Sequence, residues 1–512
     1  MMGWLLGRLG RKATAKRMYA AAQQSRLTAD WYSANSSEDY ELSVSLRILR
    51  QRSRALVRDS AYAKRARTVI VSNIIGSGIG LQAGVISTRG RLNDRINDDI
   101  EQTWTEWCLA ENCHMGGRLH FYDIERMLVA QLFEAGEVFI RKHFAPVGDS
   151  AVPLALEIIE AERIADENET PKTSPGFTTR LGIESDPYGR PVAYWVRATH
   201  PGEIRRDLAR EGQIFRVPAR EMIHLCLLDR WPQTRGVPWL HAGARRLRDM
   251  DGYAEAEIVA ARMSAAYMGF IKSPDTPIAD SESDGVQERE FRAGTIEHLA
   301  PGEDFIGWSP NRPNTAMDPF MRLMLREVAA GVGVSYESLS RDYSQTNYSS
   351  SRQALLEDRD LWRTLQQWFI RAFRAPLHKD WLDAAMLAGA IRTVPIETYL
   401  RDPGRYQAVS FKPRGWSWVD PTREVQAYRD AVGANMMTLS DVIAATGNGS
   451  DLEDVLTGRR RELDLMEELG LKDGAEKSSP EPADESVDTE SESEIEDNGG
   501  PARVLNLRRR SG

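Results

Sequence analysis

The sequence is poor in cysteine and has no long apolar run. Three cysteines in 512 residues do not suit a disulfide framework and favour a reducing cytoplasm. No stretch reaches the roughly 18 consecutive apolar residues of a membrane-spanning helix, so no membrane span is predicted. The N-terminus, MMGWLLGRLGRKATAKR, has a short apolar patch that Arg8 interrupts and that basic residues follow. This order does not fit a secretory signal.

The signatures of the common enzyme classes are missing as well. The chain has no G-x-x-x-x-G-K-[ST], no H-E-x-x-H, no C-x-x-C and no G-x-S-x-G, the local patterns of many nucleotide, zinc, redox and serine sites. Cys108, Cys113 and His114 lie close together in CLAENCH, but a structural zinc ion needs four ligands. Cys108 stands at an apolar helical position beside Trp104 and Trp107, which predicts burial in a core. The sequence therefore predicts no metal, no cofactor and no catalytic site.

The stretch TVIVSNIIGSGIGLQ, residues 68–82, brings together Gly76, Gly78 and Gly80. A dinucleotide fingerprint needs G-x-G-x-x-G followed by a helix whose N-terminus binds the pyrophosphate. Here the spacing is G-x-G-x-G, and LQAGVIST, which follows, is rich in residues that favour strands. The glycines are therefore predicted to supply the positive φ angles of a tight turn.

The net charge of −9 is distributed unevenly. Residues 1–67 carry 14 Lys or Arg and 5 Asp or Glu, a net charge of +9. Residues 475–500 carry 10 acidic residues and one Lys, a net charge of −9. The acidic segment has little to bury and is predicted to be a disordered, solvated tail. A short basic end, RVLNLRRRSG, follows it, and a tip that binds a partner is the second interpretation of this charge block.

Composition and periodicity predict a soluble globular protein of the α+β class. Hydrophobic residues make up 41% and charged residues 28% of the chain. Helices are expected over residues 40–75, over 92–111 and over 122–136, where Gly136 is the expected stop. DPYGRP, residues 186–191, is expected to form a turn between strands. The strand-like pieces are EVFIRKHF, LALEIIEAERI, TRLGIESD, GRPVAYWVRA and REMIHLCLL.

A long alanine-rich helix is predicted over residues 239–271, with Pro238 in its first turn. Small side chains permit another helix to approach closely, either within one subunit or between subunits. After a polar interval, a second helix is expected over residues 316–332. The positions that recur at steps of three, four or seven are Leu240, Ala244, Leu247, Ala254, Ile258, Ala261, Ala265 and Met268.

Residues 340–351 consist almost entirely of Ser, Tyr, Gln, Asn and Thr, with Arg341 and Asp342 among them. A loop of this composition has little reason to be buried, and it precedes a long amphipathic helix that Pro376 is expected to end or kink. No His lies near it in the sequence, so no base is available to a serine nucleophile. Hydroxyl and amide groups can instead make many weak, sequence-independent contacts with a sliding polymer.

Several pieces of the chain resemble the lambda-like phage portal proteins and occur in that family's order. Each motif is weak by itself, but their shared order and spacing over roughly residues 40–470 make the resemblance specific. The matching pieces are SNIIGSGIGLQ, EAERI, GIESDPYGRPVAYWVRATHPGE, QTRGVPWL, YAEAEIVAARMSAAYMGFI, LAPGE and NYSSSRQALLE.

The resemblance implies a dodecameric ring at one vertex of a phage capsid, made in the bacterial host cytoplasm and then part of the virion. Double-stranded DNA would enter through its channel, pumped by the terminase motor, and would leave by the same route. The implied partners are other copies of the chain, double-stranded DNA without sequence preference, the terminase large subunit, the major capsid or scaffolding protein, and a head-completion or tail adaptor protein. The ATPase partner would supply the force, because this chain has no nucleotide loop of its own.

The resemblance also implies a subunit with a wing, long stem helices, a small β-containing clip and a helical crown. Two pairs in the crown region, Thr438 with Asp441 and Ser450 with Glu453, match the capping-box pattern at helix starts. By residue number the implied parts are a basic N-terminal segment at 1–40, the wing at 41–238, a first stem helix at 239–271, the clip at 272–315, a second stem helix at 316–332, a tunnel loop at 333–350, a long kinked helix returning to the wing at 351–430, crown helices at 431–472, and a disordered acidic tail with a basic end at 473–512.

The tunnel loop is the part that the resemblance brings closest to DNA. Each phosphate that a Lys or Arg neutralises adds salt-sensitive affinity, whereas neutral hydroxyls and amides offer exchangeable contacts to sliding DNA. For any single loop residue, packing at a subunit interface is the alternative role. The DNA-facing residues would be Tyr343, Ser344, Gln345, Thr346, Asn347, Tyr348, Ser349 and Ser350, and the stem packing would use Ala244, Leu247, Ala254, Ile258, Ala261 and Ala265.

Two other classes of function compete with this interpretation. A capsid-associated structural adaptor would bind its neighbours without forming a closed, conducting ring, and it is the alternative that we retain. A hydrolase using the serine-rich loop or His224 would turn over a small molecule. The hydrolase is disfavoured, because no nucleophile, base and orienting group can be assembled from the sequence.

Overall fold

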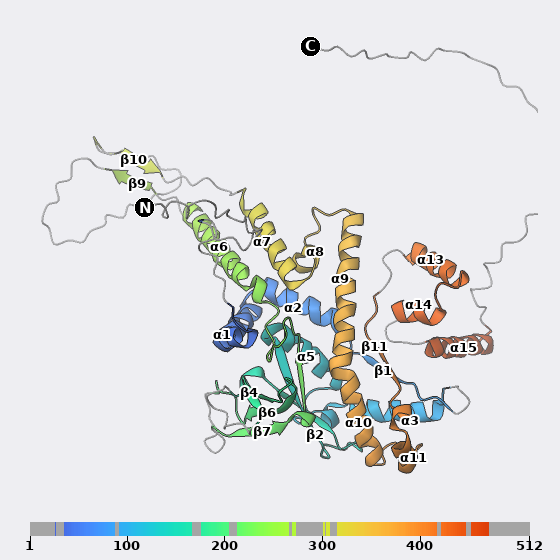
Figure 1. Cartoon of the computed structure of the whole chain (residues 1–512). Coiled ribbons are helices and arrows are strands. Elements are labelled where there is room, and N and C mark those ends of the chain that lie inside the picture. Colours follow the sequence, from blue (N-terminus) through green and yellow to red (C-terminus); the bar gives the residue numbers. More distant parts are fainter. Residues whose placement is uncertain are drawn as a thin grey trace, which may run out of the picture. The chain divides into compact units, whose positions relative to one another are not determined.

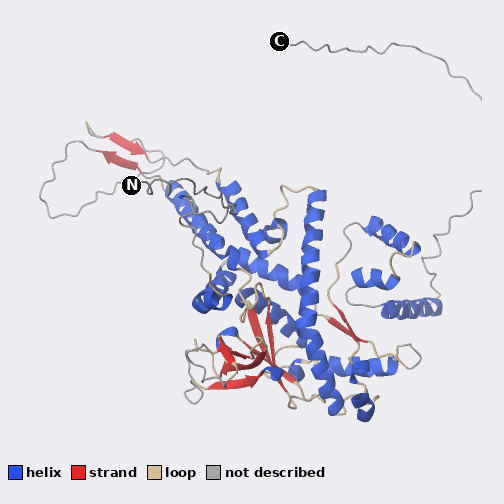
Figure 2. Cartoon of the chain, in the orientation of Figure 1, coloured by secondary structure: helices blue, strands red, loops and turns tan. Residues whose placement is uncertain are grey.

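The computed structural model is a mixed α+β protein, mostly helical with small antiparallel sheets (Figures 1 and 2). It describes residues 35–87, 92–165, 176–203, 212–265, 269–272, 301–302, 304–307, 315–416, 421–446 and 452–470, with residues 26 and 299. The chain divides into two compact units, Met1–Asp451 and Leu452–Gly512. The α+β class predicted from the sequence is confirmed. Within these ranges, no helix is long and apolar enough to cross a membrane.

The expected helical segment at 40–75 forms α1 (Glu38–Asp59) and α2 (Ala61–Ile74). α1 begins where the Ser37 hydroxyl accepts a hydrogen bond from the backbone N–H of Tyr40, at 3.4 Å. Such a side-chain acceptor satisfies one of the N–H groups that have no partner in the first turn of a helix.

The glycine-rich stretch makes the predicted turn. Gly76 has a φ of +61° and Gly78 a φ of +127°, values that only glycine adopts without strain. The turn leads from α2 into β1 (Gly80–Ala83), which pairs antiparallel with the distant β11 (Val409–Lys412). The prediction of a structural turn in place of a phosphate loop is confirmed.

α3 (Asp94–Trp107), α4 (Ala110–Cys113) and α5 (Phe121–Ala135) follow. Trp104 and Trp107 lie against Phe121, with ring centroids 5.2 and 5.3 Å apart. Cys108 is buried beside them, as predicted, and burial raises the pKa of its thiol. In the part of the chain that the structure describes, no cluster of His, Cys, Asp and Glu could hold a metal ion.

The strands form two small antiparallel sheets after α5. In the first, β2 (Glu137–His143) lies between β3 (Ala155–Ile159) and β8 (Met222–Cys226). A short 3₁₀ turn, η3 (Ala161–Arg163), follows β3, and another, η5 (Ala219–Glu221), precedes β8. The second sheet contains, in spatial order, β4 (Thr178–Arg180), β5 (Ile183–Ser185), β6 (Pro191–Arg197) and β7 (Ile214–Pro218).

The predicted turn at 186–191 joins β5 to β6. The Asp186 carboxylate accepts hydrogen bonds from the backbone N–H groups of Tyr188 and Arg190, at 2.9 and 2.8 Å, as aspartate often does in turns. β7 was not predicted. Its sequence IFRVP has only five residues and ends in Pro218, so its period-2 signal is too short to recognise.

α6 (His241–Ala265) and α7 (Met317–Val332) pack side by side and antiparallel (Figure 1). Two expectations for α6 are wrong at its ends. Pro238 precedes the helix, with its carbonyl accepting from the N–H of His241. Residues 269–272 form a strand, β9 (Gly269–Lys272), which pairs with β10 (Asp304–Gly307). The residues before β9 favour a helix, and the local sequence gives no sign that β9 pairs with β10, some 35 residues further along the chain.

Pro376 does not end the long helix, but the helix loses its regular α geometry in the turn just before the proline. α9 (Tyr348–Phe369) passes through a π-helical turn, η6 (Ile370–Arg374), into α10 (Ala375–Leu387). The N–H of Ala375 donates to the carbonyl of Ile370. Proline lacks the N–H that a regular helix would use for a hydrogen bond. Because of the wide turn, Pro376 stands in the first turn of the next helical segment, where a backbone N–H needs no partner within the helix. The expected apolar side of α9 is confirmed, with Trp362 and Phe369 buried.

Between residues 336 and 470, most of the described elements are helices. α8 (Tyr336–Ser340) precedes α9, and the remaining helices are α11 (Ile396–Arg401), α12 (Pro403–Tyr406), α13 (Pro421–Gly433), α14 (Leu439–Thr446) and α15 (Leu452–Glu468), which belongs to the second unit. The predicted pair at the start of α14 is confirmed: the Asp441 carboxylate accepts from the N–H of Thr438 at 3.0 Å and from its hydroxyl at 2.7 Å. Ser450 lies outside the described residues.

Several predicted parts also lie largely outside the described residues. They are the basic N-terminal segment before residue 35, most of the interval 272–315, and the acidic tail after residue 470.

Two hydrophobic cores hold the first unit. The larger gathers side chains from α2, α3, α5, β2, α7, α9 and α10. The smaller lies between the two sheets and includes Phe139, Ile183, Tyr194 and Val217. The backbone at Gly136 and the backbone at Val237 approach each other closely. A Cβ placed on Gly136 would lie 2.2 Å from the carbonyl carbon of Val237.

We predict that Gly136→Ala strongly destabilises the protein. Gly136 has a φ of +84° and no room for a Cβ, so both backbone strain and overlap oppose the change. Gly117 has a φ of +60° and open space around it, so Gly117→Ala is the matched control with strain alone. In urea unfolding, the control should lose about 1 kcal/mol, and Gly136→Ala more than about 3 kcal/mol. Equal losses would contradict the crowding seen at Gly136.

Candidate functional site: a polar loop and a helix pair

The polar stretch singled out in the sequence forms a short loop between α8 and α9 (Figure 1). It begins at Arg341, whose φ of +58° ends α8 in the left-handed conformation. It ends at Asn347, immediately before α9. The loop is therefore shorter than the predicted 333–350, because residues 336–340 and 348–350 are helical.

A buried carboxylate fixes the base of the loop. Asp358 of α9 is 5% exposed. It accepts hydrogen bonds from the N–H and hydroxyl of Ser335, at 2.8 and 2.7 Å, and from the hydroxyl of Ser338, at 2.6 Å. Bonds to a charged acceptor are strong, so α8 is held against α9. In the sequence, the one sign of this role for Asp358 is its position as an acidic residue on the otherwise apolar side of the helix.

A second carboxylate orders the loop itself. Asp342 accepts from the N–H of Ser344 at 3.0 Å and from the hydroxyl of Tyr336 at 2.9 Å, and Arg322 of α7 lies 3.7 Å away. Hydrogen bonds from Ser344, with that from Tyr336, lower the pKa of Asp342 to about 2. The loop is thus tied to α7 and α8 through one ionised group, which the sequence analysis noted but gave no role.

The predicted DNA-facing residues divide into two groups. Asn347 and Ser350 form a capping box: the Asn347 amide oxygen accepts from the N–H of Ser350 at 2.8 Å. Thr346 donates its hydroxyl to the carbonyl of Tyr343 at 3.1 Å. Tyr343, 59% exposed, and Gln345 present their side chains outward. Ser344 and Ser349 are also exposed, and the side chain of Tyr348 lies outside the described residues.

The predicted packing stripe of α6 is buried only near its start. Leu247 is buried and Ala244 and Ala254 are half-buried, whereas Ile258 and Ala261 are exposed. The side chain of Ala265 lies outside the described residues.

Glycines make the close approach between α6 and α7. A Cβ on Gly243 would lie 3.3 Å from Val328, and one on Gly331 would lie 3.3 Å from Ala242. Arg246 and Glu327 pair at 2.9 Å on the outside of this contact. Small residues do permit the close packing, as predicted, but at the closest contact they are glycines and not the predicted alanines.

Asn347→Ala should lower stability by about 1 kcal/mol, because the first turn of α9 loses its cap. Asn347→Asp keeps an oxygen acceptor at the same place and should cost far less. Chemical denaturation of both variants measures the difference. Equal losses of stability in the two variants would mean that the cap at Asn347 contributes little. Comparing Asn347→Ala with Asn347→Asp also separates an effect on folding from any loss of function at this position.

His224, which the hydrolase alternative would use, belongs to a buried charge cluster. Glu137 of β2 is fully buried, and its carboxylate is paired with Arg50 of α1, with Arg235 and with His224 of β8. The Nε2–Oε2 distance to His224 is 2.9 Å, and the N–H of Gly236 donates to the same oxygen at 3.0 Å. Burial alone would raise the pKa of Glu137, but Arg235 and Arg50 hold it well below its usual range.

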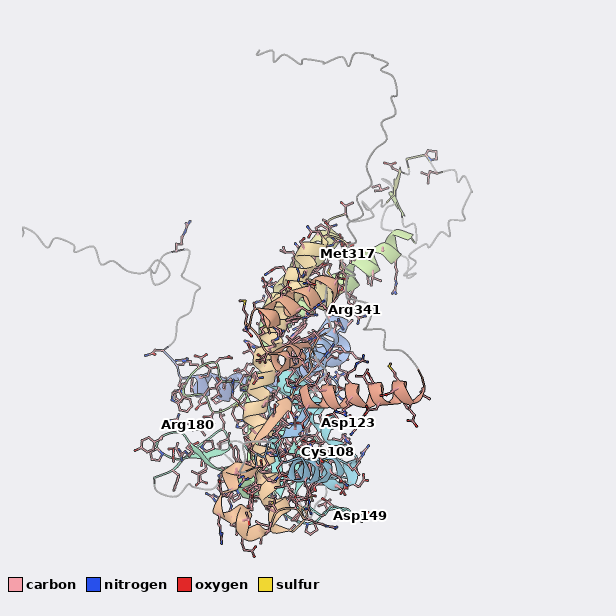
Figure 3. The ribbon with its side chains drawn as sticks, turned by 90° about the vertical axis from the view of Figure 1, so that its right-hand side faces the viewer. Cys108, Asp123, Asp149, Arg180, Met317 and Arg341 are labelled. Atoms are coloured by element: carbon pink, nitrogen blue, oxygen red, sulfur yellow. The ribbon has the colours of Figure 1, made fainter. Side chains whose placement is uncertain are left out.

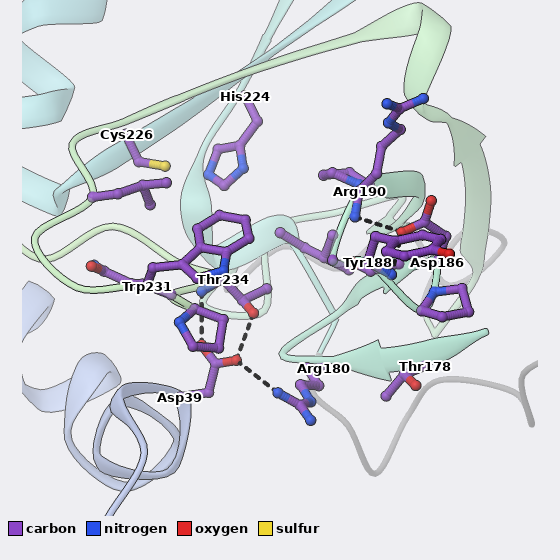
Figure 4. Close-up of a pocket in the computed structure, with 18 of the residues that line it drawn as sticks. Asp39, Thr178, Arg180, Asp186, Tyr188, Arg190, His224, Cys226, Trp231 and Thr234 are labelled. Carbon is purple, nitrogen blue, oxygen red and sulfur yellow. Dashed lines mark hydrogen bonds and ion pairs between the residues drawn. The ribbon is translucent and has the colours of Figure 1, made fainter. Parts of the chain in front are cut away.

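The imidazole of His224 faces a cleft of about 760 Å³ that Cys226, Trp231 and Tyr188 also line (Figure 4). Burial would lower the pKa of His224, but Cys226 and Glu137 raise it to about 9. A histidine that is protonated at neutral pH and bound to a buried carboxylate stabilises the fold and is a poor general base.

The raised pKa of His224 predicts a loss of stability in alkali. Its contribution is fully present below pH 6.5, the ordinary pKa, and is lost as the pH rises through about 9. The free energy of unfolding should therefore fall by roughly 3 kcal/mol over this range. His224→Gln should flatten the profile, whereas His143→Gln, at a strand histidine 2.9 Å from Glu157, should retain it. An unchanged slope in His224→Gln would contradict the assignment.

These features agree with a structural protein, and comparison with known proteins identifies the family. The family model described as phage portal protein, lambda family, matches residues 24–366. The match covers more than half of the chain, so the chain belongs to the lambda family of phage portal proteins. Members are structural, non-enzymatic parts of the phage virion. The resemblance predicted from the sequence motifs is confirmed, and the hydrolase interpretation is wrong.

Relatives are similar over most of their length. The probable portal protein of Halomonas phage phiHAP-1 is 29% identical over 474 residues, which cover 90% of this chain and 89% of that protein. Portal protein B of Escherichia phage lambda is 21% identical, with 81% of this chain and 83% of that protein covered. A solved chain from the virion of a native gene transfer agent particle has a TM-score of 0.41 and 15% identity, and covers 82% of this chain and 98% of that one.

Proposed function

We propose that this protein forms the ring at one vertex of a phage capsid through which double-stranded DNA is packaged and later ejected. Membership of the portal family and the polar loop between α8 and α9 support this proposal. The ring is dodecameric, is made in the bacterial host cytoplasm and remains in the virion. Its partners are the terminase large subunit, the major capsid or scaffolding protein, and a head-completion or tail adaptor protein.

In this proposal α6 and α7 are the stem helices and the loop at 341–347 is the tunnel loop. The segments at 41–238 and 351–430 form the wing, 272–315 the clip and 431–472 the crown. The observation that carries the assignment is chemical. The outward side chains at the tip of the loop, Tyr343 and Gln345, are neutral, and the exposed cation Arg341 stands at the start of the loop. The carboxylates of Asp342 and Asp358 are used inside to hold the loop.

A neutral loop tip suits a channel because it does not bind phosphates strongly. One added cation per subunit would introduce a phosphate contact, and each such contact steepens the dependence of log affinity on log salt by about 0.9. DNA would then be slowed at the loop, and more so at low salt. The non-conducting adaptor predicts no such effect, so the two functions can be distinguished by charge alone.

We predict that Gln345→Lys slows DNA packaging and that raised salt relieves the slowing. Gln367→Lys, an exposed position on the same helix α9 after the loop, is the matched control and should package at the normal rate. Packaging is measured as nuclease-protected DNA with purified proheads and terminase. Ring formation is checked first, by light scattering and negative-stain images, against a ring of twelve 57.6 kDa subunits.

Normal, salt-independent packaging by Gln345→Lys rings would contradict the tunnel-loop assignment while leaving the portal function intact. A wild-type protein that stays monomeric at high concentration would contradict the portal function itself and favour the adaptor.

A further inference from the structure

α1 carries an exposed apolar row opposite its buried face. Leu42 and Leu46 are buried against the body of the protein. Tyr40, Val44 and Ile48 follow one another at four-residue steps, and are 66%, 69% and 49% exposed. Residues four apart lie on the same side of a helix. Isolated exposed apolar side chains are common, but a row of three on one helix is typical of a contact surface.

Two arginines stand beside this row. Arg47 and Arg52 are exposed, and among the described residues neither forms an ion pair or a side-chain hydrogen bond. Their neighbours Arg50 and Arg54, by contrast, are used internally, by Glu137 and by Glu160 and Glu162. Glu41 is also exposed near the row, so the two arginines leave this part of α1 apolar with a net positive charge. We call Tyr40, Val44, Arg47, Ile48 and Arg52 the α1 outer face.

The outer side of α3 has the opposite charge. Asp94, Asp98 and Glu106 are exposed, and Leu109, 43% exposed, follows the helix. Arg95 is the cation among them, so the net charge of this side is negative. We call Asp94, Asp98, Glu106 and Leu109 the α3 outer face.

The other two acidic side chains of α3 point inward to fixed partners. Asp99 accepts from the N–H groups of Arg392 and Thr393, both at 2.9 Å, and Glu101 accepts from the N–H of Ala83 at 2.7 Å. On the outer face, the Glu106 carboxylate accepts from the side-chain amide of Gln102 on the same helix, at 3.1 Å. Within the described residues, Asp94 and Asp98 are the acidic side chains of α3 that no partner holds.

The two outer faces lie on different sides of the first unit. α5 stands between the helices: Arg54 of α1 donates to Gln131 of α5 at 3.2 Å, and Trp104 of α3 packs on Phe121 of α5. Figure 1 shows α1 and α3 on either side of α5. In the perpendicular view, Arg180, which pairs with Asp39 of α1, is likewise separated from Cys108 at the end of α3 (Figure 3).

We infer that the α1 outer face of one copy of this chain docks on the α3 outer face of the next copy in the ring. The inference rests on the proposed ring and names its contact. A cyclic ring needs two different, complementary patches on each subunit. The α1 and α3 outer faces carry opposite charges, so they can serve as two complementary patches. A two-fold contact of either face with itself would bring like charges together and is therefore disfavoured.

Two charge-reversal variants and their mixture test the inference. Arg47→Glu/Arg52→Glu makes both outer faces acidic, and Asp94→Lys/Asp98→Lys makes both basic. Each variant alone should lose the ring peak in light scattering, with association at least about tenfold weaker, because like charges meet at every contact. Mixed in equal amounts, the two should form rings again, with copies alternating, because every contact is then between opposite charges. Native mass spectrometry should find equal numbers of both in each ring.

The control reverses two exposed arginines on other helices, Arg371→Glu/Arg401→Glu, and should form rings by itself. Thermal unfolding checks that each variant is folded. Rings from either α1 or α3 variant alone would overturn the inference and leave the proposed function standing, and so would folded variants that do not form rings when mixed. If the wild-type protein forms no ring, the proposed function fails first.

Discussion

The fold of the first unit depends on the pairing of one carboxylate that has no access to water. Glu137 joins elements far apart in the sequence: Arg50 from α1, His224 from β8 and Arg235 from the segment that leads to α6. Arg235 also donates to the carbonyls of Leu181 and Ala161, at 2.7 and 3.0 Å, which brings in the second sheet. Removing one partner of such a buried pair typically costs about 3–5 kcal/mol, because the other charge is left unpaired. The cluster thus sets how α1, both sheets and the start of α6 meet.

A second buried ion pair has the same role for the returning helix. Arg374 ends the π-helical turn η6 and is fully buried, with Glu125 of α5 3.4 Å away and the rings of Trp104 and Phe121 5.0 and 4.9 Å from its guanidinium carbon. Burial raises the pKa of Glu125 to about 6, against the opposing effect of Arg374. The extra residue of the π turn brings Arg374 onto the side that faces α5. The helix that runs from α9 into α10 therefore reaches the core through a local irregularity, the π turn.

Local signals in the sequence predicted most elements, and contacts between distant segments account for the errors. Glycine adopts positive φ angles more readily than other residues. The turn at Gly76 and Gly78 and the end of α5 at Gly136 both need such angles, so the sequence alone predicted them. The strand β9 and the path of the helix past Pro376 depend on pairing and on a wide turn, for which a window of sequence carries no signal. In the loop, composition identified the neutral tip. It could not reveal that Asn347 is a helix cap or that Asp342 and Asp358 hold the base, because those roles are defined by three-dimensional partners.

The same buried charges bear on the proposed assembly into a ring. A ring closes only if each subunit holds its two contact faces at a fixed angle, since a small error at every contact accumulates around the circle and turns a ring into an open helix. In this chain α1 is fixed to β2 by Arg50 and Glu137, and α3 is fixed to α5 and η6 by Trp104 and Arg374. Ion pairs and aromatic contacts inside a packed core have little room to rearrange, because protein interiors are close-packed and have a low compressibility. The cost of burying these charges is thus accompanied by a fixed placement of α1 and α3 within the subunit, which the proposed ring would require.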